Sequence, residues 1–107
     1  MNLHAIRDRL LNGDTVDFVA IGSSMTGKIN NGDRVTVRPI LPDDVLGVDS
    51  IVLAKVKGTV YLHKITAIQG KRIQIGNNKG HINGWTTTDK VYGVVVMIEY
   101  SSLRGRH

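Results

Sequence analysis

Residues 22–37 read Gly-Ser-Ser-Met-Thr-Gly-Lys-Ile-Asn-Asn-Gly-Asp-Arg-Val-Thr-Val. The turn is rich in glycine and serine, and Met25 within it can anchor the turn in an apolar core. Asn30-Asn31-Gly32-Asp33 is a second, dense turn signal. The alternation of Val35 and Val37 after it is typical of a half-buried strand. Such a turn can hold a serine hydroxyl at a sheet edge, with backbone N–H groups nearby that can bind an oxyanion. A Ser-Ser pair in a glycine turn is, however, usually only a turn.

Elements with clear periodicity are expected on both sides of this stretch. Leu3 to Leu11 has apolar residues at helical spacing, and Asn12-Gly13 is a helix stop signal. Residues 76–84 are rich in glycine and asparagine, which predicts a long polar loop. Period-two alternation and β-branched residues predict six strands, at Val16–Ala20, Arg34–Arg38, Ile51–Val56, Val60–Ile68, Arg72–Ile75 and Val91–Tyr100.

Many short strands joined by glycine turns indicate a mainly β protein, built as a sandwich or a partly closed barrel with one short N-terminal helix. A chain of 107 residues is expected to form a single domain, spanning residues 1–107. Residues 1–13 would carry the helix, and residues 101–107 would be a flexible tail. The long last strand could pair across a homodimer.

Composition narrows the classes of partner and cofactor. The chain has no cysteine, which excludes a disulfide scaffold and a thiolate zinc site. The histidines and carboxylates show no ligand spacing, so we expect no metal and no other cofactor. The formal net charge of +5 permits a nucleic-acid partner, but the basic residues are scattered and only 5% of residues are aromatic. A protein or peptide partner is therefore favoured over nucleic acid.

The apolar runs of the chain are short. The longest, Val94–Ile98, is the length of a strand and far below the ~20 residues that span a membrane. The first residues lack the apolar core of a signal peptide. These features predict a soluble, cytoplasmic protein without a membrane partner.

The stretch that begins at Gly22 resembles the serine box shared by LexA-type repressors and type I signal peptidases, the S24/S26 serine peptidases. Ser24 and Met25 match its Ser-Met pair, and Gly32-Asp33 matches its Gly-Asp pair. The resemblance implies a LexA/signal-peptidase-like fold with Ser24 as the nucleophile. It also implies that the turn around Ser23 and Met25 contributes to the oxyanion hole. The family usually has a proline where this chain has Gly27.

Residues 60–65, Val-Tyr-Leu-His-Lys-Ile, resemble the family's second box. Some members have a lysine base in this strand and others a histidine, so the resemblance gives two candidate bases, His63 and Lys64. Adjacent residues of a strand point to opposite faces, and only one of the two can face Ser24. The order of residues favours His63, whose near-neutral pKa suits a general base.

The third box of the histidine-type members reads Gly-Asp-Asn, and its aspartate orients the histidine. This chain has Gly76-Asn77-Asn78, so the resemblance implies Asn77 as the orienting residue. An amide can orient an imidazole, but it supplies no negative charge. The residues of the predicted loop and its border that could bind a partner are Asn78, His81 and Trp85. Trp85 is included because tryptophan is a favoured interface anchor.

Two functions follow from these observations. The first is a serine peptidase with a Ser-His or Ser-Lys dyad, similar to small stand-alone bacterial or phage members of the family, since neither a DNA-binding domain nor a membrane anchor is seen in the sequence. The second is a catalytically inactive protein-binding module, such as a phage-type inhibitor or adaptor. Hydrolysis predicts that the hydroxyl of Ser24 lies within hydrogen-bond reach of His63 or Lys64.

Overall fold

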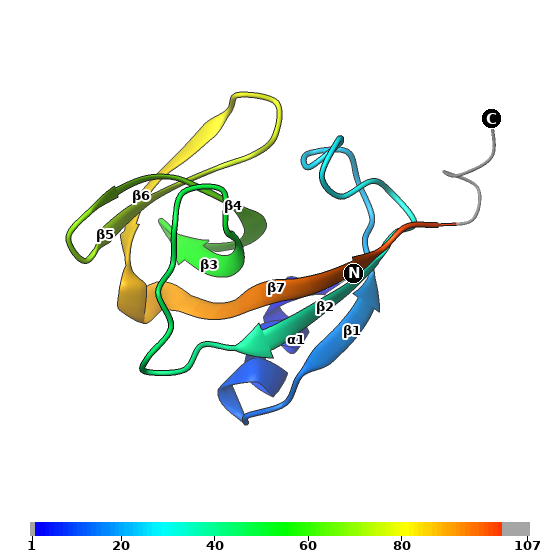
Figure 1. The fold of residues 1–107 in the computed structure, drawn as a ribbon, viewed down its shortest axis with the longest axis horizontal. Coiled ribbons are helices and arrows are strands. Elements are labelled where there is room, and N and C mark those ends of the chain that lie inside the picture. The colour runs from blue at the N-terminus through cyan, green and yellow to red at the C-terminus, as the bar shows by residue number, and fades with distance from the viewer. Residues whose placement is uncertain (1, 102–107) are drawn as a thin grey trace.

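The computed structural model describes residues 2–101, and these form one antiparallel sheet, one α-helix and one short 3-10 helix. The strands lie in the order β1-β2-β7-β3-β4-β5-β6 (Figure 1). In chain order the elements are α1 (Leu3–Leu11), β1 (Val16–Val19), β2 (Arg34–Pro39), β3 (Ile51–Val56), β4 (Thr59–Gln69), β5 (Arg72–Gly76), β6 (Ile82–Thr87), η1 (Thr88–Lys90) and β7 (Val91–Glu99).

The prediction of a mainly β protein with one short N-terminal helix is confirmed. The sheet is not closed into a barrel, since β1 and β6 remain its two ends. It does curl, because β6 folds back toward β3, where the Thr86 hydroxyl donates a hydrogen bond to the Lys55 carbonyl at 2.8 Å. No helix within residues 2–101 is long and apolar enough to cross a membrane.

The helix α1 packs against β1, β2, β4 and β7 (Figure 1). Its N-terminus is capped by Asn2, whose side-chain oxygen accepts a hydrogen bond from the Ala5 N–H at 3.1 Å. Ile6 and Leu10 are its buried residues. Close approach depends on Gly93 of β7, where a Cβ would lie 2.9 Å from Leu10 Cδ1 and 2.7 Å from Val37 Cγ1. This packing encloses one of two core clusters, and the other lies among β3, β4 and β5.

The hairpin between β3 and β4 fixes the register of the strand that carries both candidate bases. Its turn residues Lys57 and Gly58 both have positive φ, at 50° and 84°. This is the backbone of a two-residue type I′ turn, which matches the twist of antiparallel strands. The resulting register places His63 opposite Val52 and Lys64 opposite Ile51.

The prediction of a loop over residues 76–84 is wrong for the second half of that range. Residues 82–84 begin β6, which pairs with β5 through Ile75↔Gly84 and Gln74↔Trp85. A register shift between Ile75 and Gly76 and the positive φ of Gly84, 138°, accommodate the glycines within the ladder. Only residues 77–81 form a loop, and Asn83 therefore stands on a strand in a fixed position.

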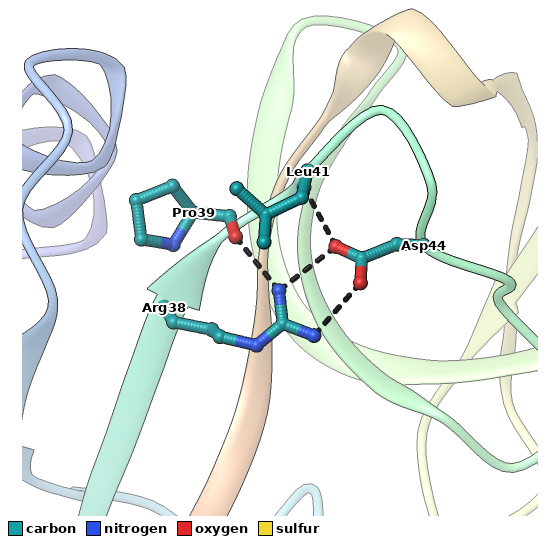
Figure 2. Close-up of polar contacts among 4 residues, drawn as sticks. All are labelled: Arg38, Pro39, Leu41 and Asp44. Carbon is teal, nitrogen blue, oxygen red and sulfur yellow. Dashed lines mark hydrogen bonds and ion pairs between the residues drawn. The ribbon is translucent and has the colours of Figure 1, made fainter.

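The β2–β3 connection is held by an ion pair at the end of β2 (Figure 2). Arg38 donates two hydrogen bonds to the Asp44 carboxylate, at 2.8 and 2.9 Å, and one to the Pro39 carbonyl at 3.0 Å. The same carboxylate accepts the Leu41 N–H at 2.6 Å. These hydrogen bonds, that of Arg38 foremost, lower the pKa of Asp44 to about 2, so the carboxylate keeps its charge, and the ion pair persists, in mildly acidic solution as well as at neutral pH. The predicted tail, residues 101–107, lies outside the described residues apart from Ser101.

Candidate active site

The serine turn is a closed loop between β1 and β2. Two backbone hydrogen bonds join its ends. The Ala20 N–H donates to the Asp33 carbonyl and the Gly32 N–H donates to the Ala20 carbonyl, both at 2.8 Å. Met25 and Ile29 are 4% and 3% exposed, and their burial anchors the loop in the core as expected for Met25. Ser24, one residue before this anchor, is exposed to solvent.

Asp33 has a structural place in this loop. Its side chain is fully buried, and its carboxylate accepts the N–H groups of Asn30 and Ser101, each at 2.9 Å. A buried carboxylate is tolerated only where it is bonded in this way. Asp33 thus connects the serine turn to Ser101, which follows β7.

Of the two candidate bases, only His63 contacts the serine. His63 Nε2 lies 3.2 Å from Ser24 Oγ, a hydrogen-bonding distance. The adjacent Lys64 points its ammonium group elsewhere and donates to Asn78 Oδ1 at 3.1 Å. The alternation of side chains along β4 thus separates the two bases.

The residue that orients His63 is Asn83, and the expectation for Asn77 is corrected. His63 Nδ1 lies 2.6 Å from Asn83 Oδ1, so the ring donates its Nδ1–H to that oxygen. Asn77 Oδ1 instead accepts the backbone N–H groups of Lys79 and His81, at 2.8 and 3.0 Å, and so shapes the loop. The sequence signal that could have found Asn83 is strand pairing across β5 and β6, which the glycine-rich composition obscured.

The environment of His63 favours the neutral imidazole. The side chain is 8% exposed, and its ring stacks on Tyr61 with centroids 5.0 Å apart. Burial lowers the pKa of His63 below its usual 6.5, although the hydrogen bond to Asn83 acts in the opposite direction. With Nδ1–H committed to Asn83, the lone pair of Nε2 faces the Ser24 hydroxyl, which is the state that a general base needs.

A small apolar cavity opens beside the serine. Its volume is about 80 Å³. Within residues 2–101, the backbone N–H groups of Ser23, Ser24 and Met25 have no described acceptor, so they are the candidate donors to an oxyanion. The lining comes from α1, the serine turn and β4, and consists of Leu3, Ala20, Ile21, Gly22, Ser24, Met25, Ile29, Tyr61, Leu62 and His63.

The other candidate binding residues lie around the site and do not enter it. His81 is exposed in the loop, and the exposed Lys79 of the same loop donates to Ser23 Oγ at 3.3 Å. Trp85 is half-buried on β6, with the Arg72 guanidinium 5.3 Å from its ring centroid. In the part of the chain that the structure describes, no group of three or more histidine, cysteine or acidic residues could hold a metal ion.

Comparison of the sequence with protein-family models gives no match, and comparison with curated proteins gives none either. The function must therefore be inferred from the contacts of Ser24, His63 and Asn83.

Proposed function

We propose that this protein is a serine peptidase of the LexA/signal-peptidase type, which hydrolyses a peptide bond through an acyl-enzyme at Ser24. One observation carries the proposal: an exposed serine hydroxyl lies 3.2 Å from a buried imidazole whose other nitrogen is held by Asn83 at 2.6 Å. The substrate would be a protein or peptide with an exposed, extended segment.

The groups at this site have distinct roles in the proposed reaction. Ser24 Oγ attacks the peptide carbonyl carbon while its proton passes to His63 Nε2. The N–H groups of Ser24 and Met25 stabilise the resulting oxyanion. Collapse breaks the C–N bond, and the imidazolium returns the proton to the leaving amine. Water then attacks the ester carbonyl carbon and gives a proton to His63 Nε2. The C–Oγ bond breaks, the imidazolium returns that proton to Ser24 Oγ, and the acid is released with the free serine.

The position of the residues along the chain supports the resemblance on which this assignment draws. The serine turn joins β1 to β2, and the base lies on β4, directly after the β3–β4 hairpin. These are the places where the serine and histidine boxes of the family are expected. The exposed turn and the cavity next to it leave room for a substrate backbone.

The second candidate function is a catalytically inactive protein-binding module. The observation that favours it is Asn83, because an amide orients the imidazole without stabilising the imidazolium. On this alternative the contact between Ser24 and His63 would be a structural hydrogen bond, and the polar loop at 77–81 would serve recognition.

A peptide-cleavage assay separates the two functions. The wild-type protein is incubated with a library of unfolded peptides, and new termini are identified by mass spectrometry, with Ser24→Ala in parallel. We expect cleavage products with the wild type and none with Ser24→Ala. Ser23→Ala should keep the activity, since of the two serines Ser24 alone contacts the imidazole. Products that appear equally with Ser24→Ala, or with neither protein, would count against the peptidase.

A further inference from the structure

Asn78 lies where the serine turn, the loop at 77–81 and β4 meet. Its backbone N–H donates to the Ser24 carbonyl at 2.9 Å. Its side-chain amide donates to the Thr26 carbonyl at 2.8 Å and accepts the Lys64 ammonium at 3.1 Å. The residue therefore bonds both to the turn that carries the nucleophile and to the strand that carries the base.

Gly27 allows this approach. A Cβ at Gly27 would lie 3.0 Å from Asn78 Nδ2, tighter than an ordinary contact, and the backbone there has a positive φ of 100°. The positive φ favours glycine at this position, and a Cβ there would also crowd the Asn78 amide. The glycine that departs from the family's usual proline is thus the residue that lets Asn78 reach the turn.

These contacts connect β4 to the serine turn by a second route. His63 bonds the Ser24 hydroxyl directly, whereas its neighbour Lys64 reaches the Ser24 and Thr26 carbonyls through Asn78. Met25 and Ile29 anchor the buried side of the turn, and the contacts of Asn78 hold its exposed side, next to Ser24, against β4. A displacement of about 1 Å at a reacting group can cost roughly 100-fold in rate.

We propose that Asn78 is a positioning residue whose side chain holds the serine turn against β4, with Lys64 acting through it and not as a base. The expected effect of Asn78 on the acylation rate rests on the proposed function. Its effect on the rigidity of the turn does not, because the hydrogen bonds exist whether or not Ser24 is acylated.

The test measures two properties of Asn78→Ala: the rate of Ser24 acylation by a fluorophosphonate probe, and the backbone ¹⁵N order parameters of residues 23–28. We expect the rate to fall about 10- to 100-fold and the order parameters of the turn to drop, while the final stoichiometry of labelling stays unchanged. Lys64→Met should lower the rate without moving the midpoint of its pH profile, and Lys64→Arg should restore it. Lys79→Met, which removes an exposed contact between the same loop and turn, is the matched control and should change neither property.

The outcomes are distinguishable. If the wild type is never acylated but Asn78→Ala still loosens the turn, the peptidase proposal fails and the positioning role stands. If the turn keeps its order parameters in Asn78→Ala, the positioning role is overturned, whatever the wild type does. If Lys64→Met abolishes the pH dependence of acylation, Lys64 is the base and the assignment through Asn78 is wrong.

Discussion

Replacing His63 with alanine is expected to slow acylation of Ser24 by roughly 10²- to 10⁴-fold, the range that a positioned general base supplies. The variant loses the group 3.2 Å from Ser24 Oγ that accepts its proton. The wild-type rate should rise with pH as His63 becomes neutral. Because burial lowers the pKa of His63, the midpoint of that rise should lie below pH 6.5. The measurement is the second-order rate constant for a fluorophosphonate probe, followed by intact mass between pH 4.5 and 9.

His81→Ala is the matched control for this experiment. His81 is exposed in the loop and its ring has no described bond to the site, so the rate constant on the neutral-pH plateau should stay close to the wild type. The charge of His81 is one of the effects that lower the pKa of His63, so the midpoint of the pH profile should move slightly to higher pH in this variant. An unchanged rate in His63→Ala would remove the imidazole from the mechanism. A wild-type midpoint well above pH 6.5 would show that the group that titrates is not the buried His63.

Replacing Asn83 with aspartate is expected to accelerate acylation of Ser24 at neutral pH by roughly 10- to 100-fold. Aspartate has the size of asparagine and keeps an oxygen at the position that accepts the Nδ1–H of His63. It adds a negative charge that stabilises the imidazolium formed as the serine loses its proton. The side-chain nitrogen of Asn83 has no described hydrogen bond, so no contact within residues 2–101 is lost.

The same substitution should move the pH profile in a defined direction. A carboxylate beside the ring favours the protonated imidazole and raises the pKa of His63, so the midpoint of the profile shifts to higher pH. The gain in rate should therefore be largest on the alkaline plateau and shrink as the solution is acidified. Asn77→Asp is the control, because Asn77 bonds the loop backbone and does not touch the ring. If Asn77→Asp accelerates the reaction and Asn83→Asp does not, the orienting residue has been assigned wrongly.

Local patterns were sufficient to predict much of the fold. The helix at Leu3–Leu11 and the strand at Ile51–Val56 have the predicted bounds, because helical spacing and β-branched runs are properties of neighbouring residues. The hairpin at Lys57-Gly58 was equally accessible, since a two-residue turn that ends in glycine closes between two apolar runs.

The strand β6 could not be predicted in this way. Its first residues, Ile82, Asn83 and Gly84, have the composition of a loop and are ordered by pairing with β5 across a register shift. Pairing of this kind depends on contacts that composition does not encode. The site is affected in the same way, because composition places Asn83 in a loop and the three-residue motif at Gly76 points to Asn77.

The choice between the two bases also needed the structure. Alternation along β4 showed that His63 and Lys64 face opposite sides, but not which side meets Ser24. That depends on how the serine turn folds over β4, where burial of Met25 and the hydrogen bonds of Asn78 place the hydroxyl next to the imidazole.

The most direct test of a Ser24 nucleophile is the location of a fluorophosphonate adduct on the wild-type protein. The protein is incubated with the probe at pH 8, digested, and analysed by tandem mass spectrometry. We predict one adduct per chain, on Ser24 and not on Ser23, that is absent when the protein is unfolded before labelling. A folded protein that carries no adduct, or carries it at another residue, would contradict a catalytic role for Ser24.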